Sequence, residues 1–323
     1  IQCMAVTDDI SYDCKSTSSS AALDESIYNG GNCDRLVVVS AGNIETTEID
    51  ASDYIESCKA NVIKSPAQAW NALTVGAYTE KTVVTDDRYK PLAAPGGISP
   101  MSRTSWSWRN GLNKPEIVME GGNVADHPVL QTTTPDLSLI STSADLAESL
   151  EPFYATSAAT ALAARMAAKI KTVNPDLSLL SVRGMMVHSA RWTEEMKRIG
   201  SINDIMSICG YGIPDEKIAL FSNERYATYI FENELIPYVR KDGSNTYNQL
   251  HFYDLPWPVE LLEQMGAEKV KIRITLSYYV KPSPGYAGRR NKYRYPSATL
   301  HFDLKSPHEN VEEFLCRRNK NEG

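Results

Sequence analysis

Two short stretches of this chain carry residue types that could act together on a carbonyl group. Ser157 stands near the front of a run from 153 to 170 that is rich in Ala, Ser and Thr and contains no Gly or Pro, which is typical of a helix. A serine at such a helix start lies beside the positive end of the helix dipole and beside unpaired backbone N–H groups. Both favour an alkoxide and the oxyanion that follows its attack on a carbonyl. Taken alone, the run is also typical of a buried Ala-rich helix with a Ser/Thr cap.

The second stretch is the apolar run 36–39, which is followed by small residues and then Asn43. The run is typical of a buried strand, and ligands of α/β folds bind at the carboxyl ends of parallel strands. The Asn43 side-chain amide could donate to a developing oxyanion together with the backbone N–H of Ser157. Without Ser157, Asn43 would be interpreted as a turn residue after Gly42.

Together the two stretches resemble the subtilisin-like serine peptidases. The nucleophile motif of that family is Gly-Thr-Ser-(Met/Ala)-Ala-(Thr/Ser)-Pro, and residues 155–161 read Ala-Thr-Ser-Ala-Ala-Thr-Ala. Ala155 replaces the usual Gly, and Ala161 replaces the usual Pro. The Ala-Gly-Asn at 41–43 matches the strand end that carries the family's oxyanion asparagine. Further matching segments extend the resemblance over residues 1–213.

The resemblance implies an α/β fold in which residues 1–213 are the C-terminal portion of a subtilisin-like parallel-sheet domain. It implies a serine endopeptidase with Ser157 as nucleophile and Asn43 in the oxyanion hole. A buried strand at 1–6 would pair with an extended polypeptide substrate through main-chain hydrogen bonds. The small residues 40–42 would form one wall of the primary specificity pocket. The substrate-binding residues implied in this way are Ala5, Val6, Thr7, Ser40, Ala41, Gly42 and Thr156.

A serine nucleophile needs a base, and the base needs an orienting carboxylate. In the family, the catalytic Asp and His precede the groove strand with which this chain opens, and the five histidines here include no His-Gly pair. We therefore expect an upstream segment, absent from this chain, to supply both residues. The adjacent Asp126 and His127 are a poor alternative, because neighbours in sequence rarely point at one another. His188 resembles a packed helix-end histidine of the family.

Two other interpretations stay open. The chain could be a catalytically inactive pseudopeptidase that binds extended peptides or proteins without cutting them. It could also be an unrelated serine hydrolase, although no Gly-x-Ser-x-Gly motif surrounds Ser157. The sequence contains no His-Glu-x-x-His motif, so we expect neither a catalytic metal nor a cofactor.

The hydrophobic pattern changes to period two beyond Pro214. Apolar and polar side chains alternate over 270–278 and 298–304, which is typical of half-buried antiparallel strands. With 226–236 and 249–253, these segments predict a jelly-roll-like antiparallel β-sandwich domain over residues 214–323.

The length, composition and net charge of the chain limit the partners that we expect. With 323 residues, of which 42% are hydrophobic, the chain is long enough for one large domain or two. The net charge of −7 argues against nucleic acid or an anionic membrane as a partner, and no apolar run is long enough to cross a membrane. The six cysteines show neither metal-ligand spacing nor disulfide-scaffold density. They predict free thiols and a cytoplasmic location, although a leader could have been lost with a missing front.

Overall fold

The chain divides into two compact units. The first comprises Ile1–Glu234 and His251–Tyr295, and the second comprises Leu235–Leu250 and Pro296–Gly323. The expected division at residue 213 stays a prediction. The computed structural model describes residues 1–8, 17–108, 112–145, 147–222, 226–236, 238–255, 258–282, 302–306 and 308–320.

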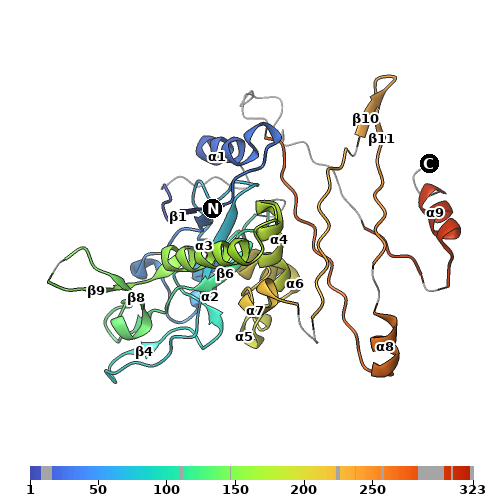
Figure 1. Ribbon diagram of the computed structural model, residues 1–323. Helices are drawn as coiled ribbons and strands as arrows, with labels where there is room; N and C mark the ends of the chain where they lie inside the picture. Colours follow the sequence, from blue (N-terminus) through green and yellow to red (C-terminus); the bar gives the residue numbers. More distant parts are fainter. Residues whose placement is uncertain are drawn as a thin grey trace. The chain divides into compact units, whose positions relative to one another are not determined.

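A parallel sheet lies at the centre of the first unit (Figure 1). Its parallel strands are, in spatial order, β1 (Gln2–Met4), β2 (Val37–Ser40), β3 (Leu73–Thr79) and β6 (Ile117–Glu120). The short strand β5 (Gly97–Ile98) pairs antiparallel with the end of β3. The mixed α/β class with a parallel-rich sheet is therefore as the sequence predicts.

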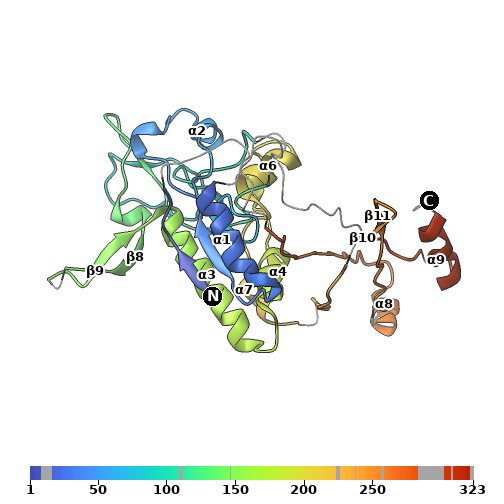
Figure 2. The same ribbon diagram turned by 90° about the horizontal axis from the view of Figure 1, so that it is seen from above.

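Helices cover both faces of this sheet, which explains why the run 36–39 is apolar throughout. The side chains at 36 and 38 face α3 (Ala155–Val173) and α4 (Leu179–Ser189), whereas those at 37 and 39 face α1 (Ser18–Tyr28). Figure 2 shows α1 and α3 on opposite sides of the strands. The Ala-rich face of α3 packs directly on the sheet, because small side chains let helix and strands approach closely.

The strand at the N-terminus differs from its expectation. The sequence predicts a buried strand over 1–6, but β1 is short, stands at the end of the sheet and is largely exposed. Ile1 is 42% exposed and Val6 is 72% exposed. The expected burial is not seen in the described residues, where β1 is hydrogen-bonded to β2 alone.

A cluster of charged side chains joins the starts of β3 and β6 to α4. Lys114 is buried and donates to the Glu116 carboxylate and to the Ala72 carbonyl. The other oxygen of Glu116 accepts the Thr74 N–H at 2.7 Å, and Arg183 reaches the same carboxylate at 3.2 Å. A buried carboxylate with this many donors ties β3, β6 and α4 together.

The other elements of the first unit are short. The hairpin of β8 (Leu139–Thr142) and β9 (Leu150–Phe153) leads directly into α3. The remaining ones are α2 (Tyr54–Ala60), β4 (Lys90–Pro91), β7 (Ala125–Asp126), α5 (Glu194–Lys197), α6 (Ile202–Cys209), α7 (Glu216–Leu220), α8 (Val259–Met265) and the 3₁₀ turns Asn29–Gly31, Thr46–Glu48 and Pro135–Leu137.

The β-sandwich expected beyond residue 213 is not confirmed. Segments 226–236, 249–253 and 270–278 form no strand in the structure, and 298–301 lie outside the described residues. The strand expectation for 270–278 is wrong, because the segment pairs with no neighbouring strand in the described residues and its polar side chains bond α4 and the turn after it. Its alternating apolar side chains (Val270, Ile272, Ile274, Leu276 and Tyr278) are 43–59% exposed.

The polar side chains of this segment lie against α4 instead. Residues 273–280 form what we term the strap. Arg273 donates to the carbonyls of His188 and Ala190, at 2.8 and 2.6 Å. Asn71 exchanges two hydrogen bonds with the backbone of Val280, at 2.9 and 2.8 Å. These contacts make the strap part of the first unit.

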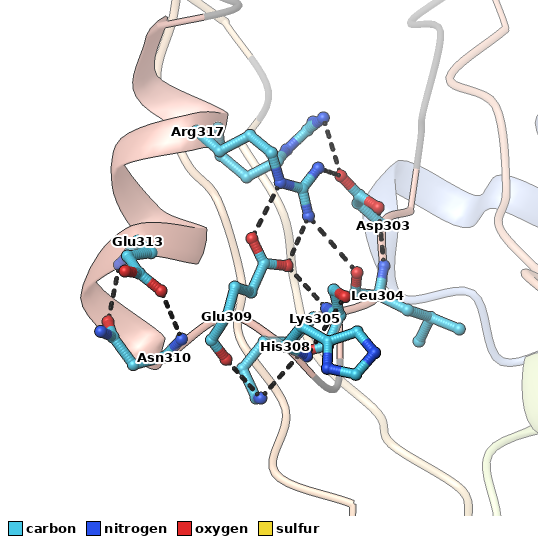
Figure 3. Close-up of polar contacts among 10 residues, drawn as sticks. Asp303, Leu304, Lys305, His308, Glu309, Asn310, Glu313 and Arg317 are labelled. Atoms are coloured by element: carbon cyan, nitrogen blue, oxygen red, sulfur yellow. Dashed lines mark hydrogen bonds and ion pairs between the residues drawn. The ribbon is translucent and has the colours of Figure 1, made fainter.

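The second unit contains a hairpin and a helix. Strands β10 (Tyr238–Lys241) and β11 (Ser244–Tyr247) pair antiparallel, and α9 (Val311–Lys320) follows Asn310. Figure 3 shows the polar contacts at the start of α9. Arg317 binds the carboxylates of Asp303 and Glu309, at 2.7 and 2.8 Å, and the bond to Glu309 contributes to lowering the pKa of Glu309 to about 2.

Candidate active site

The helix that carries Ser157 begins with an unusual backbone conformation. Ser157 is the third residue of α3, after Ala155 and Thr156. Ala155 has φ +62°, a left-handed conformation that suits Gly and costs another residue about 1–2 kcal/mol. This is the position where the subtilisin-like motif has Gly. Because Ser157 lies in the first turn of α3, its N–H has no acceptor within the helix, and none in the described ranges, so it is available as a hydrogen-bond donor.

Gly121 holds this helix start in place. Its carbonyl accepts the Ala155 N–H at 2.6 Å. A Cβ at Gly121 would lie 2.5 Å from the Ala77 Cβ and 2.8 Å from the Ala155 carbonyl oxygen. The end of β6 and the start of α3 can approach each other this closely because residue 121 is Gly.

Glu120 fixes the backbone of the turn after β6. One carboxylate oxygen accepts the Gly122 N–H at 2.8 Å, and the other accepts the Glu80 N–H at 2.7 Å. The carboxylate thus closes the turn after β6. Sequence reasoning missed this role, because the Glu80 segment is 40 residues away in the chain.

Asn43 lies directly beside the start of α3. Its Oδ1 accepts hydrogen bonds from the Thr156 N–H, at 3.1 Å, and from the Thr156 hydroxyl, at 2.6 Å. Because a backbone N–H can only donate, the amide oxygen must face Thr156, and Nδ2 must point elsewhere. Nδ2 has no acceptor among the residues that the structure describes. The site therefore offers two donors, the Asn43 amide and the Ser157 N–H, from neighbouring positions.

Thr156 has a different place from the one expected. The sequence suggests a substrate-binding residue, but the Thr156 side chain is fully buried. Its hydroxyl is bonded to Asn43, and its carbonyl accepts the Thr160 hydroxyl at 2.6 Å. The Thr156 side chain therefore contacts Asn43 in the interior, and its substrate-binding role stays a prediction.

The residues expected to line the substrate groove, Ala5, Val6 and Thr7, follow β1. The Ser157 Oγ lies 3.5 Å from the carbonyl oxygen of Ala5, at the outer limit of a hydrogen bond. Ala5 and Val6 are exposed, and Thr7 is half-buried. The structure thus brings Ser157 and the segment after β1 together, although Ser157 and Ala5 are 152 residues apart in the chain.

The residues expected to form one wall of the primary specificity pocket lie mostly in the protein interior. Ser40 and Ala41 are buried in the sheet, so in this structure they face packed side chains rather than an open pocket. Gly42 has φ +95°. A Cβ there would lie 3.1 Å from the Cδ of Arg103 and 3.1 Å from the Cβ of Lys64. These two cationic residues, which sequence reasoning did not single out, enclose the glycine before Asn43.

The histidines near this region have other partners. His127 stacks on Tyr89 with ring centroids 5.1 Å apart, and its neighbour Asp126 accepts from Gln131. His188 bonds the Thr275 hydroxyl at 2.9 Å, and burial and nearby arginines lower its pKa. In the described part of the chain, Ser157 Oγ is bonded to Ala5 and to no histidine.

The described residues contain no group of His, Cys, Asp or Glu side chains that could hold a metal ion. They also contain no helix that is long and apolar enough to span a membrane.

The fold and the site define an α/β protein in which a serine at a helix start lies beside an asparagine at the end of a parallel strand. A sequence model of the subtilase family matches residues 1–212. The chain belongs to the subtilase family.

A relative and a solved structure show further similarity. The chain is 26% identical over 283 residues to the uncharacterized protein y4bN of Sinorhizobium fredii (strain NBRC 101917 / NGR234), covering 80% of this chain and 61% of that protein. The chain thus spans less than two thirds of that relative's length. It also resembles a protease of Pseudoalteromonas arctica PAMC 21717, with a TM-score of 0.40 and 16% identity, covering 65% of this chain and 48% of that one. A likeness this weak adds nothing to the functional assignment.

Proposed function

We propose that this chain is the nucleophile-bearing portion of a serine endopeptidase whose catalytic Asp and His come from an upstream segment. The observation that carries the proposal is the orientation of Asn43. With Oδ1 bound to Thr156, its Nδ2 is left to donate beside the N–H of Ser157. Paired donors of this kind stabilise the oxyanion of an acyl-transfer reaction.

The reaction would follow from this geometry. The base takes the proton of Ser157 Oγ as the oxygen attacks the peptide carbonyl, and the charge that develops on the carbonyl oxygen is held by Asn43 Nδ2 and the Ser157 N–H. The same base then returns the proton to the leaving amine. Water releases the acyl group in the second half of the reaction.

The contact between Ser157 and the segment after β1 supports an extended polypeptide as the substrate. A peptide that pairs with this segment would gain main-chain hydrogen bonds that are indifferent to its sequence. Past the end of the strand, Ala5, Val6 and Thr7 would border its side chains, and the Ser157 hydroxyl is close to Ala5. Gly42, with Lys64 and Arg103 around it, would contribute to the pocket next to the scissile bond. The cytoplasmic location stays a part of the proposal.

Fluorophosphonate labelling tests the proposal, because the reagent modifies activated serines. We expect labelling of the full protein that includes the upstream segment, and none of its Ser157→Ala variant. Asn43→Ala should leave the serine in place and slow labelling by about 10²–10³, the range typical for loss of one oxyanion donor, for which the asparagine of subtilisin is itself the reference case. Undiminished hydrolysis of an unstructured protein by Ser157→Ala would refute the assignment.

A peptide-binding protein without peptidase activity is the second candidate. It is favoured by Ala155, which holds a φ of +62° at the position where the family's nucleophile motif has Gly. In that case the folded full protein would bind an extended peptide with and without Ser157→Ala, and neither form would be labelled.

A further inference from the structure

We propose that Arg103 is the positioning residue that sets the direction of the Asn43 amide, an inference that rests on the proposed oxyanion role of Asn43. Arg103 is 8% exposed, and its Nε donates to the main-chain carbonyl of Asn43 at 2.6 Å. A hydrogen bond from a guanidinium is stronger than one between neutral groups. This bond fixes the backbone from which the amide extends.

The main chain on both sides of Asn43 is held by the same segment. The Ile44 N–H donates to the Met101 carbonyl at 3.0 Å, and the Arg103 N–H donates to the Gly42 carbonyl at 3.4 Å. Residues 42–44 and 101–103 thus run antiparallel around a bridge at Asn43. The guanidinium adds a side-chain bond to this pair of backbone bonds.

Arg103 also connects this turn to a second loop. Its Nη1 donates to the Val62 carbonyl at 3.3 Å, and its Nη2 lies 3.8 Å from the Glu48 carboxylate. The planar guanidinium can bond several acceptors at fixed angles, which a lysine ammonium cannot reproduce. Arg103 therefore joins the loop after β2 to the segment after α2 and prevents the turn at Gly42 from shifting.

Asn43 is then held at two points, its main-chain carbonyl and its side-chain oxygen. Arg103 fixes its main-chain carbonyl, and Thr156 fixes its Oδ1. With both ends held, Nδ2 has one direction and does not have to reorganise when an oxyanion forms. Preorganised donors of this kind lower the barrier without strengthening substrate binding.

The experiment uses the full protein and a double-mutant cycle of Arg103→Met and Asn43→Ala. Arg103→Met should lower kcat by about 10- to 100-fold, less than loss of the oxyanion donor itself, with little change in KM. In the Asn43→Ala background the same substitution should have almost no further effect. Arg103→Lys should restore only part of the rate. The control Arg198→Met removes an exposed arginine that pairs with Glu195 and should leave the rate unchanged.

An equal loss from Arg103→Met in both backgrounds, or a change confined to KM, would overturn the proposal. Hydrogen exchange of the Thr156 N–H gives a second readout that needs no activity, because this N–H donates to Asn43 Oδ1. Its exchange should accelerate at least about tenfold in Arg103→Met while the amides of β3 stay protected. An unchanged exchange rate would reject the positioning role. Absence of hydrolysis in the wild type would instead reject the peptidase, so the two failures are distinct.

Discussion

Gly121→Ala is the sharpest test of how the start of α3, with Ser157, is held. The new methyl group would lie 2.5 Å from the Ala77 Cβ and 2.8 Å from the Ala155 carbonyl oxygen, where carbon atoms normally approach to about 3.5–4.0 Å. Relieving the overlap requires β6 and the start of α3 to separate by roughly 1 Å. Overpacking of this kind costs about 1–3 kcal/mol, and reduced freedom of the unfolded chain offsets about 0.4–1 kcal/mol of it.

The substitution should therefore lower both stability and reactivity. Each kcal/mol corresponds to about 2–4 °C in Tm for a domain of 150–250 residues, which calorimetry resolves. Because Ala155 begins the helix that carries Ser157, a displacement near 1 Å should also slow fluorophosphonate labelling by about 10²-fold.

The control is the same chemical change elsewhere. At Gly184 in α4, an added Cβ would meet the Ser277 Cβ at 3.2 Å, and the helix would gain about 0.5–1 kcal/mol from replacing Gly by Ala. Gly184→Ala should keep the labelling rate. Wild-type Tm and labelling in Gly121→Ala would show that the close approach at Gly121 is not what positions Ser157.

Three further predictions concern the strap and the second unit. Asn71→Ala removes both hydrogen bonds to Val280. It should destabilise the first unit by about 2–4 kcal/mol, since a buried N–H and C=O lose their partners. Urea unfolding measures this loss, and an unchanged unfolding midpoint would exclude a docked strap. The lowered pKa of His188 means that the unfolded chain binds more protons below its usual value near 6.5, so stability should be complete above that pH and fall below it. His188→Gln should flatten this dependence in a pH series of thermal scans. The pKa of Glu309 is about 2 instead of 4.5. The α9 contacts should therefore contribute fully to stability above pH 4.5 and be lost as the pH falls toward 2. Amide exchange of α9 in the wild type and in Arg317→Met should differ above pH 4.5 and converge near pH 2.

The parallel sheet and the identity of the paired residues followed from local patterns. The run 36–39 is apolar at every position, and a strand with helices on both faces requires that. The small residues of 155–161 allow α3 to lie close to the sheet. Period-two patterning at 270–278 was misleading, because alternation reports that one face is polar and does not report which face meets the protein. In the strap, the polar face does.

The sequence by itself determined the α/β class, the family and the two motifs that carry Ser157 and Asn43, because strand burial and helix composition are recorded in neighbouring residues. Only the tertiary structure decided that Oδ1 of Asn43 faces Thr156, that Gly121 abuts Ala155 and that Arg103 holds the Asn43 carbonyl. These contacts join residues that are 34 to 113 positions apart. Their geometry depends on how the strands and helices pack, and no local pattern in the chain encodes it.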